Sequence, residues 1–233
     1  VVQARIPQGA QALMRLAVFD CDGTLVDGQA DVCAAMDEAF AAAGLVAPDR
    51  HRTRRMVGLS LPEAMRQLLP EGEADQHEAL AAHYRDAYRA RRTAGMIDEP
   101  LFEGMTDLLA RLSSAGWLLG VATGKSDRGL AHCLSTHGIA EHFVTLQTAD
   151  RHPSKPHPAM LEAALFEASA APGEAVLIGD TVYDIAMARA TGVRAIGVSW
   201  GYHEPAELLA AGAAGVAASA EHLEELIDAR PAS

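Results

Sequence analysis

No uninterrupted apolar stretch in this chain of 233 residues approaches the roughly 20 residues that a membrane-crossing helix needs. The sequence therefore predicts no membrane span and no membrane partner. The first 16 residues, VVQARIPQGAQALMRL, also lack the apolar region of a signal peptide. We expect them to form a loose N-terminal arm.

Cysteine is scarce as well. The three cysteines, Cys21, Cys33 and Cys133, form no close pair in the sequence. An odd number of cysteines without a CxxC spacing favours reduced thiols and gives no zinc signature. We therefore expect a cytoplasmic protein without a disulfide framework.

Basic residues are outnumbered, with 19 lysines and arginines against 31 acids and a net charge of −12. This balance argues against general nucleic-acid binding, although a metal ion or a local cation would still allow small anions to bind. Only Lys125 and Lys155 are lysines. A lineage bias towards arginine explains the scarcity, but both lysines fall in loops that we consider below as candidate sites.

The hydrophobic pattern changes along the chain. An apolar run at residues 16–19 predicts a buried strand, and residues 28–98 show helical spacing without a convincing strand. Strands at 117–122, 143–147, 175–179 and 193–198 then alternate with helices, and Val216 fits a short final strand. Such alternation predicts an α/β fold, a Rossmann-like parallel sheet with helices on both faces. We expect residues 1–27 and 99–233 to form this core and residues 28–98 to form an inserted all-helical cap domain.

Chemically active residues follow four of the predicted strands. They are Asp20 and Asp22, then Thr123 and Lys125, then Lys155, and finally Asp180 and Asp184. Parallel sheets carry their sites at the carboxyl ends of strands, so we expect these segments to meet. Clustered carboxylates suit Mg²⁺, and a carboxylate can attack phosphorus while a second one moves protons.

The segment GVATGKS, residues 120–126, has a second interpretation as a nucleotide-binding P-loop. A P-loop needs four residues between its first glycine and the Gly-Lys-Ser. Only three residues separate Gly120 from Gly124, which speaks against an NTPase.

Taken together, DCDGTL, the threonine of VATGKS, the lysine of SKPHP and IGDTVYD resemble the four motifs of the haloacid dehalogenase superfamily. The cap inserted after the first strand resembles its phosphoglycolate phosphatase and β-phosphoglucomutase branch. The resemblance extends from about residue 16 to residue 228.

The resemblance assigns roles by position. Asp20 resembles the nucleophile, and Asp22 resembles the general acid and base, with its carbonyl facing the metal. Thr123, the backbone N–H groups around Gly124, and Lys155 would hold the phosphoryl oxygens. Mg²⁺ would lie among the acidic residues Asp20, Asp22, Asp180 and Asp184.

The other residues of interest lie in the cap and in loops outside the four motifs. The cap segment RRMVGLS places Arg55, Gly58 and Ser60 where related enzymes contact substrate, although a solvated helix face is an equal alternative. We interpret Lys125 as a surface or helix-capping residue, and His157 and His203 as structural loop or cap residues. Cys21 is expected to pack, and Asp27 to cap the first cap helix. Tyr84 and Tyr88 are expected to pack in the core or at the cap hinge.

The resemblance implies a Mg²⁺-dependent phosphatase of a small phosphorylated metabolite such as 2-phosphoglycolate, acting through an aspartyl-phosphate as a monomer or homodimer. One alternative is a β-phosphoglucomutase-like phosphomutase. An alternative of another class is a signalling receiver module, but receivers place their acidic pair adjacently, whereas here the acids alternate as Asp20-x-Asp22. A dehalogenase would lack Asp22, and a Schiff-base hydrolase would need a lysine in the cap.

Overall fold

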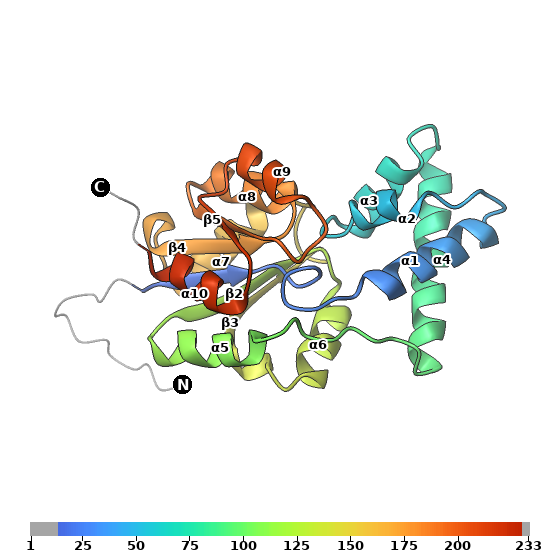
Figure 1. The fold of residues 1–233 in the computed structure, drawn as a ribbon. Coiled ribbons are helices and arrows are strands. Elements are labelled where there is room, and N and C mark those ends of the chain that lie inside the picture. Colours follow the sequence, from blue (N-terminus) through green and yellow to red (C-terminus); the bar gives the residue numbers. More distant parts are fainter. Residues whose placement is uncertain (1–13, 230–233) are drawn as a thin grey trace, which may run out of the picture.

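The computed structural model describes residues 14–229, so most of the expected N-terminal arm lies outside the described residues. Within this range the chain forms a six-stranded sheet in which all neighbouring strands are parallel (Figure 1). The strand order is β3-β2-β1-β4-β5-β6. The strands are β1 (Leu16–Phe19), β2 (Leu118–Thr123), β3 (Phe143–Thr148), β4 (Ala175–Gly179), β5 (Arg194–Val198) and β6 (Val216–Ala217). The predicted fold class is confirmed.

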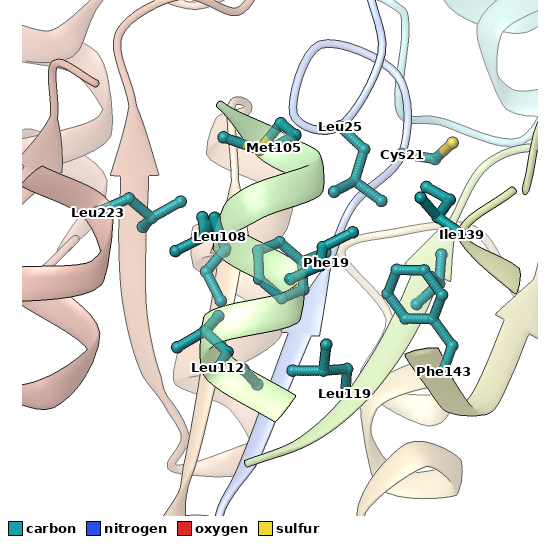
Figure 2. Packing of buried hydrophobic residues seen from close by; sticks show 14 of the residues in the cluster. Phe19, Cys21, Leu25, Met105, Leu108, Leu112, Leu119, Ile139, Phe143 and Leu223 are labelled. Carbon is teal, nitrogen blue, oxygen red and sulfur yellow. The ribbon is translucent and has the colours of Figure 1, made fainter. Parts of the chain in front are cut away.

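Helices cover both faces of the sheet because alternate strand residues point to opposite sides. Phe19 faces a core formed with α5 (Met105–Ser114), α6 (Asp127–Thr136) and α10 (Ala220–Asp228), part of which is shown in Figure 2. Val18 faces the opposite core, formed with α7 (Ala159–Ala168), α8 (Val182–Thr191) and α9 (Pro205–Ala211). Two short 3₁₀ turns, η1 (Ala140–His142) and η2 (Pro172–Glu174), precede β3 and β4.

Residues 28–98, which we call the helical insertion, contain four helices beside the sheet (Figure 1). They are α1 (Gln29–Ala42), α2 (Arg50–Arg54), α3 (Leu61–Leu68) and α4 (Ala74–Thr93). These helices bury an apolar cluster of their own: Met36, Phe40, Met65, Leu68, Leu80 and Ala81. The expectation that Asp27 caps the first of these helices is wrong in position, because the N-cap residue of α1 is Gly28. Asp27 precedes it and accepts a hydrogen bond from the backbone N–H of Gln29 at 3.3 Å.

The chain enters and leaves the helical insertion at neighbouring points. The backbone N–H of Asp27 donates to the carbonyl of Pro100 at 2.9 Å, and that of Phe102 donates to Leu25 at 3.0 Å. An antiparallel bridge joins Val26 to Leu101 between these two bonds. Two crossing segments therefore hold the insertion against the carboxyl end of β1.

The strand order places a topological switch between β1 and β4. From β1 the chain adds β2 and β3 on one side, and then returns to add β4, β5 and β6 on the other. The N–H of Asp20, just beyond β1, donates to the carbonyl of Ile178 in β4 at 2.9 Å. Ligands of open parallel sheets bind at the carboxyl ends of strands at such a switch. Among the described residues, no helix combines the length and apolar character required to cross a membrane.

The fold predicts a contrast between two leucines in helices. Leu109 of α5 is fully buried in the core, whereas the side chain of Leu209 in α9 is 52% exposed. Leu109→Ala should lower the free energy of unfolding by about 2–5 kcal/mol, because the change leaves a cavity. The matched Leu209→Ala should change it by no more than about 0.5 kcal/mol. Urea unfolding followed by circular dichroism measures both, and equal losses would contradict the assigned core.

Candidate functional site

Three buried aspartates meet where β1 and β4 end. Asp20 follows β1, Asp180 follows β4, and Asp184 lies in the first turn of α8. One carboxylate oxygen from each lies within 4.8 Å of the others. The orientation of Asp184 is fixed by Thr181, whose hydroxyl donates to Oδ2 of Asp184 at 2.6 Å while capping α8. The sequence prediction that these strand ends converge is thus confirmed.

The ammonium of Lys155 lies between two of these carboxylates. Its Nζ is 2.8 Å from Oδ1 of Asp20 and 2.7 Å from Oδ1 of Asp184, and all three side chains are fully buried. Burial alone would lower the pKa of Lys155, but Asp184 and Asp20 outweigh it and raise the pKa above its ordinary value. Lys155 is therefore a permanent positive charge beside Asp20.

One oxygen of Asp20 is left free to react. Oδ1 pairs with Lys155 and accepts the N–H of Cys21 at 2.6 Å, whereas the buried Oδ2 has no hydrogen-bond partner. Burial raises the pKa of Asp20 to about 7, although Lys155 opposes this shift. A buried acceptor without a partner is costly, so Oδ2 is suited to a cation or an electrophile.

Asp180 is oriented by two donors. The hydroxyl of Thr24 donates to Oδ1 and the backbone N–H of Tyr202 donates to Oδ2, each at 3.0 Å. Burial nevertheless raises the pKa of Asp180 well above its ordinary value, and Asp20 adds to this effect. The backbone comes close to this carboxylate at Gly23, where φ is +83° and an added Cβ would overlap the Asp180 side chain. Glycine is therefore required there both by conformation and by space.

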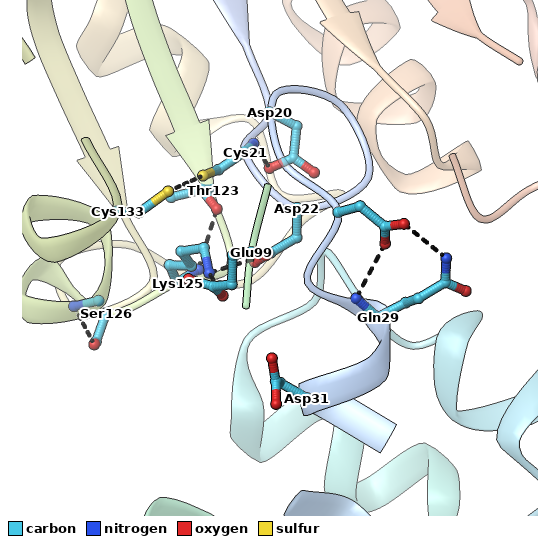
Figure 3. Close-up of polar contacts among 12 residues, drawn as sticks. Asp20, Cys21, Asp22, Gln29, Asp31, Glu99, Thr123, Lys125, Ser126 and Cys133 are labelled. Carbon is cyan, nitrogen blue, oxygen red and sulfur yellow. Dashed lines mark hydrogen bonds and ion pairs between the residues drawn. The ribbon is translucent and has the colours of Figure 1, made fainter. Parts of the chain in front are cut away.

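Asp22 belongs to a second charged group, shown in Figure 3. The Nζ of Lys125 is 2.9 Å from Oδ1 of Asp22 and 2.7 Å from Oε1 of Glu99. The hydroxyl of Tyr88 in α4 donates to the same Glu99 oxygen at 2.6 Å. Burial raises the pKa of Asp22, while Lys125 lowers it. The interpretation of Lys125 as a surface or capping residue is wrong, because its side chain is only 11% exposed and joins Asp22 to Glu99, just after the helical insertion.

Thr123 ends β2 beside this group, and Gly124 follows it. Thr123 is buried, and its hydroxyl accepts the N–H of Lys125 at 3.2 Å. Gly124 lies against the loop at Gly58 and Leu59, so that a Cβ added there would overlap both backbone carbonyls. A Cβ added to Gly58 would lie 3.6 Å from Oδ2 of Asp20. The loop of the helical insertion therefore passes directly over the aspartates.

Two of the residues predicted to contact substrate join the insertion to elements around the sheet. The guanidinium of Arg55 forms two hydrogen bonds with Glu207 in α9, at 2.8 and 2.9 Å. This pairing lowers the pKa of Glu207 to about 2. The N–H of Ser60 donates to Oγ of Ser154 at 2.8 Å, one residue before Lys155. Both contacts hold the insertion over the site.

The remaining interpretations concern packing and capping. His203 is buried, contacts the N–H of Val182 at the start of α8 and the carbonyl of Arg55, and has a pKa lowered by burial. His157 accepts the N–H of Ala159 at the start of α7. The structural interpretation of both histidines is confirmed. Cys21 is buried with its sulfur 3.8 Å from that of Cys133, as expected for packing, and the rings of Tyr84 and Tyr88 stack with centroids 5.8 Å apart.

Sequence analysis missed Glu99 and Thr24. Glu99 lies outside the four motifs and contacts Lys125 across 26 positions of the sequence. One feature of the sequence pointed towards such a partner. Both lysines lie in candidate site loops, and a lysine that becomes buried there needs an acidic partner. Thr24 lies inside the DCDGTL segment, where its hydroxyl contact with Asp180 spans 156 positions.

Comparisons with known proteins agree with this geometry. The sequence is 33% identical over 198 residues to the probable phosphatase IndB of Dickeya dadantii, covering 84% of this chain and 86% of that protein. It is 28% identical over 219 residues to a phosphoglycolate phosphatase of Vibrio parahaemolyticus, covering 92% and 96% of the two chains. The fold matches the structure of a haloacid dehalogenase-like hydrolase from Streptococcus pneumoniae with a TM-score of 0.80 and 27% identity, covering 92% and 99%. Residues 17–198 match the sequence profile of the family described as haloacid dehalogenase-like hydrolase, and the chain belongs to this family.

Proposed function

We propose that the protein is a Mg²⁺-dependent phosphatase that hydrolyses a small phosphorylated metabolite through an aspartyl-phosphate on Asp20. The observation that carries this proposal is the free, buried Oδ2 of Asp20 beside the charged Lys155. The name phosphatase among the relatives supports hydrolysis over transfer of the phosphoryl group back to a sugar. The relative from Vibrio parahaemolyticus makes 2-phosphoglycolate a first candidate substrate.

The buried carboxylates fit a small divalent cation. Oxygens of Asp20, Asp180 and Asp184 are within reach of one point. All three carboxylates are fully buried, and the ammonium of Lys155 contacts two of them, so their combined negative charge suits a further cation. Mg²⁺ prefers such hard oxygen ligands and retains waters beside them. Asp22 would add its backbone carbonyl. When bound, the cation supplies positive charge for the phosphoryl oxygens.

The chain's own residues then divide the reaction into two steps. In the first step Oδ2 of Asp20 forms a bond to phosphorus, and the bond between phosphorus and the ester oxygen breaks. Asp22 gives its proton to the departing alcohol. In the second step Asp22 takes a proton from water, whose oxygen attacks phosphorus and releases phosphate and free Asp20. Lys155 and Thr123 hold the phosphoryl oxygens throughout.

We also propose that residues 1–27 and 99–233 form the catalytic core and residues 28–98 its cap domain. The separate apolar cluster of the helical insertion and its contacts over Asp20 support this division. A cap that covers the site excludes water and strengthens the electrostatic interactions inside it. The three described cysteines are free thiols, which is consistent with our proposal of a cytoplasmic location.

The first test of this proposal replaces the nucleophile. Asp20→Asn should reduce phosphate release from p-nitrophenyl phosphate to background, because an amide does not attack phosphorus. The matched Asp107→Asn alters an exposed aspartate in α5 and should retain parental turnover. Turnover of Asp20→Asn within about tenfold of the parent, against the far larger losses that follow removal of a nucleophile, would rule out the covalent route.

The second test removes the metal. Chelation with EDTA should abolish turnover and lower the melting temperature, and Mg²⁺ should restore both, because a ligand that binds the folded state stabilises it. Ca²⁺ should bind yet support little turnover, since its looser coordination suits in-line transfer poorly. Asp180→Asn should lose the Mg²⁺-dependent rise in melting temperature. Full activity after thorough chelation would contradict the metal assignment.

The third test displaces the cap loop. Gly124→Ala forces the carbonyls of Gly58 and Leu59 away from β2, which should lower kcat/KM by about 10²-fold, as expected when reacting groups are misplaced by about 1 Å. Gly173→Ala is the matched control, because nothing lies within 4 Å of its added Cβ. Differential scanning calorimetry establishes that both variants are folded. Parental kcat/KM in Gly124→Ala would show that the loop position does not matter.

A further inference from the structure

The helical insertion and the sheet enclose a cavity of about 440 Å³ that extends outward from Asp22. Its lining includes Gly58 of the insertion, Gly124 just beyond β2, and residues of α1, α4 and α6. Under the proposed function, Asp22 faces the leaving alcohol, so this cavity receives that part of the substrate. Its volume lies within the range of about 300–1,000 Å³ that suits metabolite- to drug-sized ligands. A two-carbon glycolate would occupy only a small part of it.

One wall of the cavity is apolar. It is lined by Val32 and Met36 of α1, Val57 and Leu59 of the loop between α2 and α3, and Tyr84 of α4. The ring of Tyr84 stacks on that of Tyr88, which also lines the cavity. This wall suits an apolar or ring-shaped body in the leaving group, because burying apolar surface is favourable without any hydrogen bond.

Arginine residues line the cavity as well. Arg85, Arg89 and Arg92 of α4 recur at spacings of four and three residues, which places them on one helix face. Arg128 of α6 adds a fourth guanidinium from the core. Four arginines thus line one cavity in a chain whose net charge is −12.

These arginines have few acidic partners. Among the described residues, no ion pair joins Arg85, Arg92 or Arg128 to an acid, and Arg89 has a single exposed pair with Asp86 at 3.3 Å. The buried Nε of Arg92 has no hydrogen-bond partner. By contrast, Arg55 is held by two hydrogen bonds to Glu207. The arginines of the cavity therefore retain donors for a ligand.

The acids that line the cavity are fewer than the cations. Asp22 and Asp150 are the two acidic residues among those that line it. Asp22 is already paired with Lys125 at 2.9 Å, and Asp150 accepts the N–H of Asp127 at 2.9 Å. Five cationic residues, the four arginines and Lys125, thus line the cavity against these two acids, and this excess of positive charge favours an anionic ligand.

Contacts through Tyr88 fix the position of the α4 arginines relative to the site. The Tyr88 hydroxyl contacts Glu99, Glu99 contacts Lys125, and Lys125 contacts Asp22. Arg85 and Arg92 lie three residues before and four residues after Tyr88, within about one helical turn of it. Asp22 and these arginines thus line one cavity, with Tyr88 linked to Asp22 through Glu99 and Lys125.

We propose that the natural substrate is a phosphate monoester whose leaving alcohol has an apolar or ring-shaped body and a second anionic group, bound by Arg85, Arg89, Arg92 and Arg128. This inference rests on the proposed phosphatase function and adds the substrate class. The second anion is a carboxylate or a further phosphate, since the planar fork of arginine matches both in a bidentate manner.

Three aryl phosphates with a common ring test the proposal and separate the two anions. They are 4-(2-hydroxyethyl)phenyl, 4-(carboxymethyl)phenyl and 4-(phosphonomethyl)phenyl phosphate, which are neutral, carboxylate-bearing and phosphonate-bearing at the far end. The methylene insulates the ester oxygen and keeps the three leaving groups similar. We expect kcat/KM to be about 10- to 100-fold higher for at least one anionic ester, the usual worth of a hydrogen bond between charged groups. This preference should shrink as salt is added.

Single variants Arg85→Gln, Arg89→Gln, Arg92→Gln and Arg128→Gln locate the anion. The ratio of kcat/KM for the preferred anionic ester to that for the neutral ester should fall by about tenfold in at least one α4 variant and in Arg128→Gln. These changes lie on two different elements, so misfolding of one variant leaves the other to decide. Arg66→Gln is the matched control, because Arg66 is exposed, pairs with Glu63 and lies outside the cavity lining. It should keep the parental ratio.

The possible failures are distinguishable. Release of phosphate from all three esters at equal kcat/KM would overturn this inference and leave the phosphatase function standing. A preference for the anionic esters that survives in every arginine variant would also overturn it. No release from any aryl phosphate in the presence of Mg²⁺ would overturn the proposed function, and this inference with it.

Discussion

The arrangement of the site depends on a single buried ammonium among three carboxylates. Asp20, Asp180 and Asp184 lie within reach of one another without solvent, and like charges taken out of water repel strongly. Lys155 bridges two of them at 2.8 and 2.7 Å, which offsets part of this repulsion. Removing one partner of a buried ion pair lowers the free energy of unfolding far more than removing one partner of an exposed pair does. The position of Lys155 is therefore under tighter physical constraint than that of any surface charge.

Each of the two lysines forms ion pairs with two acidic residues, one of which has a proposed role in the reaction. Lys155 pairs with Asp20, the proposed nucleophile, and Lys125 pairs with Asp22, the proposed acid. Lysine is a compact charge with rotatable donors, whereas arginine presents a wide planar fork. In a sequence that otherwise uses arginine, lysine thus occurs where a small buried cation must fit between two carboxylates. Arginine occurs where a guanidinium group lines the open cavity or joins two elements. Arg55, for example, joins the helical insertion to Glu207 of α9.

How far the sequence alone predicts this site depends on the range of the interactions. Asp20 and Asp180 follow apolar strands, so local pattern and the geometry of parallel sheets were sufficient to bring them together. The expected strand positions were confirmed for the same reason. The partner of Lys125 was not predictable, because Glu99 reaches it only after the helical insertion folds back onto the core. Arg55 could not be paired with Glu207 from local pattern, since 152 positions separate them.

The neighbouring entry and exit of the helical insertion have an evolutionary consequence. Val26 and Leu101 pair directly. The 74 residues between them therefore form a closed loop whose two ends are fixed at the same place beside the sheet. Lengthening a loop with fixed ends costs little free energy, and insertions succeed best where the flanking backbone is undisturbed. Changes to α1–α4 can therefore accumulate without altering the register of β1 and β4, the strands that Asp20 and Asp180 follow. Descendants of this chain can diversify in what they recognise while inheriting unchanged chemistry.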